Sequence, residues 1–164
     1  MDPDIWQALG QLTIYYSLLE GQLRFSIWAL MGAEEQEPAR IAMAGRPFAA
    51  LVDMFCSLCR LRGMDERRID ALRADLARVS EARNRYAHSE WDVGRGPGSA
   101  LRFRHTAKAK DGLRFTFEHV TAENIRALAD DISRVATRIA WIEAPGDAMG
   151  VWPEESRQAH PGGG

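Results

Sequence analysis

Residues 66–88 read ERRIDALRADLARVSEARNRYAH, and this stretch organises the interpretation of the whole chain. Its apolar residues recur at spacings of three and four, which is typical of a buried helix face. They are Ile69, Leu72, Leu76 and Val79. The same spacing then reaches Arg83 and Tyr86, so a face that is apolar for about three turns meets a permanent cation. Because an unpaired guanidinium is costly to bury, we expect Arg83 to meet an anion, a partner chain or water.

The end of this predicted helix places three side chains suited to phosphate chemistry close together. Asn84 and His88 are four residues apart and therefore share one helical face, with Arg83 on the adjoining face. An imidazole exchanges protons near neutral pH, and a guanidinium stabilises developing phosphate charge. A lone His in a helix is more often structural than catalytic. Both interpretations of His88 therefore stand at this stage.

The order Arg83, Asn84, three intervening residues and His88, late in a helix of a small helical protein, resembles the signature of the HEPN family. These three residues carry the resemblance, and the layout of long helices with a hairpin insertion is compatible with it over roughly residues 4 to 143. The resemblance implies a metal-independent endoribonuclease that works as a homodimer. Many members are toxins or phage-defence effectors, so an antitoxin protein is a candidate partner.

The sequence departs from one variant of that family. Some HEPN toxins carry a Tyr two residues after the His, where a nucleotidyltransferase antitoxin modifies it. Glu90 occupies that position here, followed by Trp91. The departure argues against that form of regulation and leaves nuclease activity open.

RNA cleavage without a metal needs a base for the 2′-hydroxyl, an acid for the leaving 5′-oxygen and cations around the phosphorane. One chain offers one suitable His, whereas a two-fold dimer offers two copies of His88 and two of Arg83 across a shared cleft. We expect His88 to transfer protons, Arg83 to neutralise charge and Asn84 to orient the phosphate or the imidazole. The products would be a 2′,3′-cyclic phosphate and a 5′-hydroxyl. Candidate supporting residues are Arg85, Tyr86 and Ser89.

A metal centre and a cofactor are not expected. No HExxH motif occurs, and the other three His residues lie in the hairpin region or near the C-terminal end of the sequence. Glu20 is a further candidate because it falls on the apolar side of the first helix. It either reaches solvent at the edge of the stripe or pairs with Arg83 and orients the motif.

The patterns predict a mainly α-helical fold, an up-and-down bundle of four to five helices with a β-hairpin inserted before the last helix. Residues 1–143 form the predicted domain, and residues 144–164 form a predicted flexible tail rich in Gly and Pro. The predicted helices cover about residues 3–31, 38–44, 48–62, 66–90 and 122–144, with Gly32, Gly45, Gly63 and Pro145-Gly146 as stop signals.

The predicted hairpin, at about residues 100–119, alternates apolar and basic residues around a turn at Asp111-Gly112. We expect its apolar side to pack on the helices and its basic side to face outward. That side either keeps an edge strand soluble or contacts RNA phosphates. The candidate RNA-binding residues are Arg102, Arg104, Lys108, Lys110 and Arg114.

Composition fits an ordinary globular protein, with 46% hydrophobic and 27% charged residues and a formal charge of −2. Bulk attraction to nucleic acid is therefore not indicated, and any anion site must be local. Cys56 and Cys59 lie in an apolar helical pattern, so we interpret them as buried thiols in a reducing compartment rather than as a redox pair. No apolar run of about 18 residues and no basic signal region occur, so a cytoplasmic location without a membrane span is expected.

Two other function classes remain open. A HEPN-like domain can serve as a non-catalytic binding or scaffold module that recognises RNA, a nucleotide or a protein partner. A purely structural dimer would pair Arg83 with Glu20 and leave no open cleft.

Overall fold

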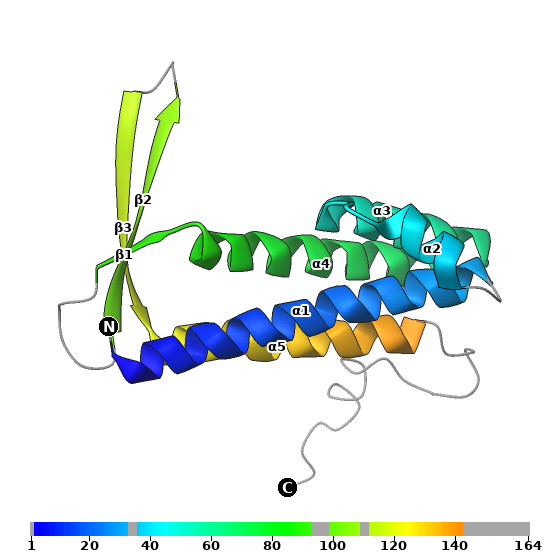
Figure 1. The fold of residues 1–164 in the computed structure, drawn as a ribbon, viewed down its shortest axis with the longest axis horizontal. Coiled ribbons are helices and arrows are strands. Elements are labelled where there is room, and N and C mark those ends of the chain that lie inside the picture. The colour runs from blue at the N-terminus through cyan, green and yellow to red at the C-terminus, as the bar shows by residue number, and fades with distance from the viewer. Residues whose placement is uncertain (1, 33–35, 93–98, 109–111, 143–164) are drawn as a thin grey trace, which may run out of the picture. The chain divides into compact units, whose positions relative to one another are not determined.

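The computed structural model describes residues 2–32, 36–92, 99–108 and 112–142. Figure 1 shows the order of the elements, which confirms the predicted mainly α-helical fold with strands inserted before the last helix. The elements are α1 (Pro3–Met31), α2 (Gln36–Met43), α3 (Phe48–Leu61), α4 (Glu66–Ala87), β1 (Glu90–Asp92), β2 (Ser99–Lys108), β3 (Gly112–Thr121) and α5 (Ala122–Ile142). The predicted tail at residues 144–164 lies outside the described residues.

The chain forms two compact units, and each is assembled from separate segments. Unit 1 comprises Met1–Leu18 and Ala77–Ser133, and unit 2 comprises Leu19–Leu76 and Arg134–Gly164. Unit 1 therefore holds the beginning of α1, the end of α4, the three strands and the first half of α5. Unit 2 holds the remaining parts of these helices together with α2 and α3.

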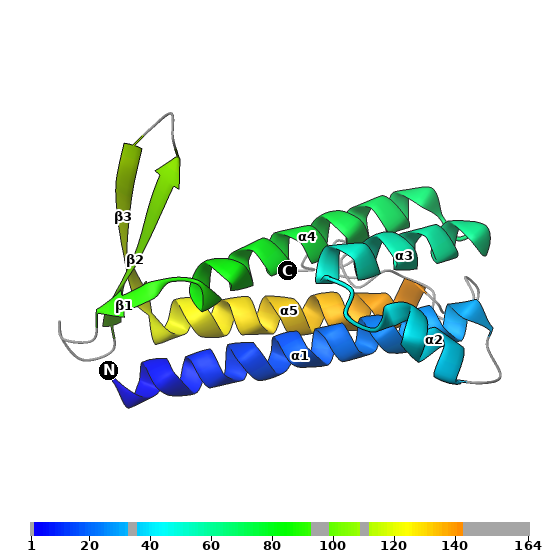
Figure 2. The ribbon, with the colours of Figure 1, turned by 45° about the horizontal axis from the view of Figure 1, so that its top comes forward.

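In unit 1 the end of α4 runs opposite to the neighbouring parts of α1 and α5, as the two views in Figures 1 and 2 show. Its core contains apolar residues from all three helices and from the sheet. The buried residues are Ile5, Ala8, Leu12, Tyr16, Val79, Ala100, Val120, Ala122, Ile125, Ala129 and Ile132. Ion pairs lie around this core, from Arg126 to Asp4 and from Arg78 to Asp131.

The sheet of unit 1 is antiparallel, with strand order β1-β2-β3. Strands β2 and β3 form the predicted hairpin, in register from Ser99 opposite Thr121 to Lys108 opposite Gly112. Strand β1, which the sequence pattern did not predict, pairs with β2 so that Trp91 lies opposite Arg102. This pairing requires extended backbone from Glu90, so α4 ends at Ala87 rather than continuing to residue 90.

The helices begin and end close to the predicted signals. The carboxylate of Asp2 accepts a hydrogen bond from the amide of Asp4 at 2.8 Å, and that of Asp65 accepts one from Arg68 at 2.9 Å. At the start of α5, Thr121 and Asn124 exchange side-chain-to-backbone hydrogen bonds in the manner of a capping box. Gly32 follows α1 with φ of 65°, a conformation that glycine adopts without steric strain.

The core of unit 2 is built from the stripes predicted in the sequence. Its buried residues are Leu19, Leu23, Ile27, Leu30, Ala39, Met43, Leu51, Val52, Phe55, Cys56, Cys59, Ile69, Leu72, Leu76, Val135, Ile139 and Ile142. Both cysteines are buried thiols, as predicted. Burial raises the pKa of the Cys56 thiol, against the opposing influence of Arg60.

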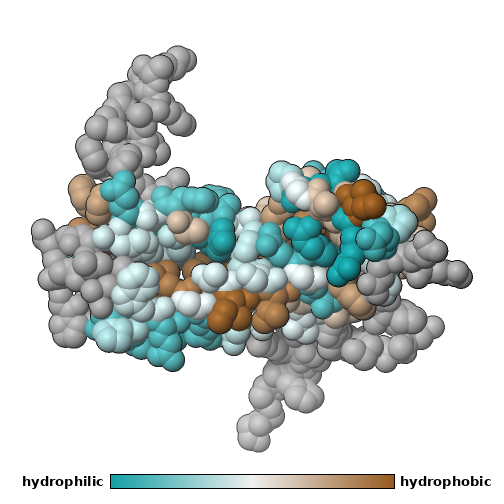
Figure 3. All heavy atoms as spheres, viewed as in Figure 1, coloured by the Kyte–Doolittle hydropathy of each residue, from teal (hydrophilic) through white to brown (hydrophobic). Residues whose placement is uncertain are grey.

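The surface of α1 also carries large apolar side chains. Ile14 and Leu18 are 60% and 63% exposed and lie on the helix face opposite the buried stripe of Ile5 and Leu12. Figure 3 shows apolar atoms at the surface over this helix. No helix in the described part of the chain is long and apolar enough to cross a membrane.

The buried thiols give a first prediction. In the native protein, Cys56 and Cys59 should react with a thiol reagent such as DTNB far more slowly than a free thiol, because burial excludes the reagent and raises the pKa of Cys56. In denaturant both should react at once, which absorbance at 412 nm would follow. Rapid native labelling at neutral pH would contradict this burial.

Candidate functional site

Arg83 lies over an aromatic ring within its own unit. Its guanidinium carbon is 4.6 Å from the centroid of the Tyr16 ring, and its Nη1 donates a hydrogen bond to the side-chain oxygen of Asn84 at 3.2 Å. The Tyr16 hydroxyl shares a hydrogen bond with Ser80 Oγ at 2.9 Å, which fixes the ring. Among the described residues, the half-buried cation is thus accommodated by a π face and by a neutral amide oxygen.

Asn84 and His88 are both exposed and lie one helical turn apart. The amide of His88 donates to the carbonyl oxygen of Asn84 at 3.0 Å, so the helical hydrogen-bonding pattern reaches His88 although α4 ends one residue earlier. The sequence therefore predicted their spacing correctly. Solvent can reach both side chains, which a catalytic imidazole requires.

The candidate supporting residues have distinct roles. Ser89 Oγ donates to the carbonyl oxygen of Arg85, which satisfies a backbone acceptor at the end of α4. Arg85 itself is exposed. The Tyr86 ring stacks on Trp91, with centroids 6.2 Å apart and planes 21° from parallel, and so ties the helix to β1.

A pocket of about 190 Å³ opens next to these residues. Arg83 is the one charged residue among the described residues that line it, and apolar or aromatic groups form most of the remaining wall. The lining residues are Leu9, Leu12, Thr13, Arg83, Tyr86, Ala87 and Trp91. The pocket is smaller than the roughly 300–1,000 Å³ of pockets for drug-sized ligands, so it suits one small group such as a phosphate.

Arg102 does not face outward, and the prediction that it does is wrong. Its side chain is buried, pairs with the carboxylate of Glu118 and lies with its guanidinium carbon 4.9 Å from the centroid of the Tyr86 ring. On the other face of the hairpin Phe103 and Phe117 contact each other, and Phe117 is 63% exposed. The sheet packs its Arg102 side against the aromatic end of α4.

The other candidate RNA-binding residues are not placed by the structure. Lys110 and the side chains of Arg104, Lys108 and Arg114 lie outside the described residues. Glu20 is half-buried and belongs to unit 2, so both alternatives for it, exposure to solvent at the edge of the stripe and pairing with Arg83, stay predictions.

The residues that sequence reasoning missed are Tyr16, Ser80 and Trp91. Tyr16 sits in the buried stripe of α1, where a hydroxyl-bearing residue among Leu and Ile signals a polar partner. Within the described residues, no group of three or more His, Cys, Asp or Glu side chains is arranged to hold a metal ion.

Comparison with known proteins adds no relative. No protein-family model, curated protein or solved structure matches the chain.

A double-mutant cycle can measure the hydrogen bond between Tyr16 and Ser80, which fixes the ring that Arg83 lies over. Tyr16→Phe keeps the ring but removes the hydroxyl, so it should lower the free energy of unfolding by about 1 kcal/mol. Ser80→Ala should lower the free energy of unfolding by about the same amount. The double variant should lose little more than either single variant, because the same hydrogen bond is lost in all three. Urea denaturation provides the values, and strictly additive losses would contradict this coupling.

Removal of the Glu118 charge tests the burial of Arg102. Glu118→Gln keeps the shape of the side chain but weakens the ion pair of a cation that is 6% exposed, so unfolding free energy should fall by about 1–3 kcal/mol. Glu81→Gln on the exposed side of α4 is the matched control and should change it by less than about 0.5 kcal/mol. Equal effects of the two substitutions would exclude the buried pair.

Proposed function

We propose that this chain is a metal-independent endoribonuclease of the HEPN type that acts as a homodimer. The observation that carries the proposal is that His88 and Asn84 are both exposed and lie one helical turn apart. Arg83, the third residue of the motif, precedes Asn84 and is held in position by the Tyr16 ring. The pocket lined by Arg83 supports it, because a phosphate is the group that a single guanidinium in so small a site would bind.

In the proposed reaction, the 2′-oxygen of a ribose attacks the adjacent phosphorus while the bond from phosphorus to the 5′-oxygen breaks. One His88 imidazole takes the proton of the 2′-hydroxyl, and His88 of the second copy gives a proton to the leaving 5′-oxygen. Arg83 stabilises the charge of the phosphorane, and Asn84 orients the phosphate. The products are a 2′,3′-cyclic phosphate and a 5′-hydroxyl.

The proposal extends to a biological role as a cytoplasmic toxin or phage-defence effector, with an antitoxin protein as a partner. The motif alone supports this part. Glu90, exposed at the start of β1, stands where the modifiable Tyr of some HEPN toxins would be, so we propose control by some other means.

A non-catalytic binding module is the second candidate, and the contacts of Arg83 favour it over a purely structural dimer. Its Nη1 already bonds to Asn84, which can fix both side chains for anion binding without any proton transfer. In that case His88 would contribute to recognition rather than to chemistry.

Incubation of purified protein with mixed RNA in EDTA tests the enzyme directly. Cleavage with 2′,3′-cyclic phosphate ends is expected, and His88→Ala should slow it roughly 10²–10⁴-fold because both proton transfers are lost. Arg83→Ala should slow it about 10²-fold or more through loss of charge stabilisation.

Two matched variants serve as controls. His119→Ala removes an exposed imidazole outside the motif, and Arg67→Ala removes an exposed guanidinium near the start of α4. Both should cleave at the wild-type rate, and all four variants should sediment as dimers. Intact RNA at micromolar protein would favour the binding module, and a monomeric protein would exclude the composite site.

A further inference from the structure

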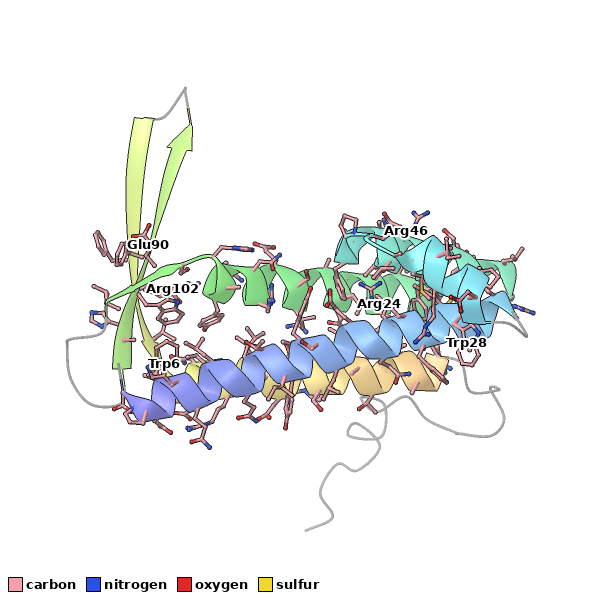
Figure 4. The ribbon with its side chains drawn as sticks, in the orientation of Figure 1. Trp6, Arg24, Trp28, Arg46, Glu90 and Arg102 are labelled. Atoms are coloured by element: carbon pink, nitrogen blue, oxygen red, sulfur yellow. The ribbon has the colours of Figure 1, made fainter. Side chains whose placement is uncertain are left out.

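Unit 2 contains a larger pocket, of about 370 Å³, which falls within the range of small-molecule sites. Helix α1 and helix α2 both contribute to its wall. The described lining residues are Gly21, Arg24, Phe25, Trp28, Arg40 and Met43. In Figure 4, Arg24 and Trp28 lie on the end of α1 that adjoins α2.

Both charged residues in this lining are arginines. Arg24 is half-buried, and its Nη1 donates to the carbonyl oxygen of Met43 at 3.1 Å, which holds the guanidinium between the two helices. Arg40 is exposed and forms no hydrogen bond or ion pair with any residue that the structure describes. Since the described lining residues include no acid, the pocket favours an anion, and two guanidinium groups suit a phosphate.

Two further described lining residues, Phe25 and Trp28, are aromatic. The rings of Phe25 and Trp28 meet edge to face, with centroids 5.3 Å apart and planes at 65°, and Phe25 is 55% exposed. Trp28 lines the pocket, and its Nε1 is buried without a hydrogen-bond partner among the described residues. Such rings stack with a planar heterocycle such as a nucleobase.

Gly21 supplies open space on the same helix. A Cβ atom built at this position meets no atom within 4 Å, and the same holds for Gly10, which does not line the pocket. A side chain at residue 21 would therefore occupy the pocket wall without disturbing described neighbours. A side chain at residue 10 would also disturb no described neighbour, but it would lie outside the pocket.

We propose that this pocket binds a nucleoside phosphate, with its base on Phe25 and Trp28 and its phosphate on Arg24 and Arg40. The proposal is independent of the ribonuclease proposal, since it involves none of the motif residues. A free nucleotide and a nucleotide unit of single-stranded RNA share this chemistry.

Isothermal titration calorimetry with AMP tests the pocket, with adenosine and inorganic phosphate as partial ligands. AMP should bind at least about tenfold more tightly than either, because stacking and phosphate contacts act together. Arg40→Ala should weaken AMP about tenfold, and Gly21→Leu should abolish binding without lowering Tm, since replacing a helical Gly favours the helix.

Arg46→Ala and Gly10→Leu are the matched controls and should bind AMP as the wild type does, because neither residue lines the pocket. A short oligoadenylate, titrated into the full chain carrying His88→Ala so that it stays intact, distinguishes the two sources. Binding of the oligonucleotide but not of AMP, with the same sensitivity to Arg40→Ala and Gly21→Leu, would assign the pocket to RNA. No binding of either ligand, or equal losses in the pocket and control variants, would overturn the proposal.

Discussion

The end of α4 is held by arginine side chains that rest on tyrosine rings. Arg83 lies on Tyr16 of α1, and Arg102 of β2 lies on Tyr86 of α4 itself. A ring face attracts a cation and excludes water without the large desolvation penalty of a second buried charge. This arrangement lets the apolar stripe of α4 end on a positive charge while Asn84 and His88 stay open to solvent.

Most of the helical architecture could be predicted because it depends on local signals. Spacings of three and four marked the buried faces, and Asp65 and Thr121 marked where α4 and α5 begin. The end of α4 could not be predicted in the same way. It is set by the pairing of β1 with β2, a contact between Trp91 and a residue later in the chain that no local pattern encodes.

The hairpin shows a second feature that the sequence pattern could not predict, namely which of its faces is buried. Alternation with a period of two divides its side chains into two faces, but it does not say which face packs inward. The Phe-bearing face was expected to be buried. Instead the aromatic pair of Tyr86 and Trp91 provides a site for Arg102, and Phe103 and Phe117 cover each other on the opposite face.

Only the local part of the candidate site could be predicted from the sequence. The spacing of Asn84 and His88 follows from helical geometry and could be derived from sequence. The partner of Arg83 could not, because Tyr16 lies 67 positions earlier in the chain and only the fold brings the two together. The exposed pocket arginine, Arg40, likewise has no sequence signature that separates it from other surface arginines.

The discontinuous make-up of the two units has a consequence for how the protein is synthesised. Each unit takes one stretch from the beginning of the chain and another from α5, the last helix that the structure describes. During translation, neither unit can close its core until α5 has left the ribosome exit tunnel. The nascent chain therefore carries the open apolar faces of α1 and then of α4 until α5 emerges, a period in which chaperones have access to them.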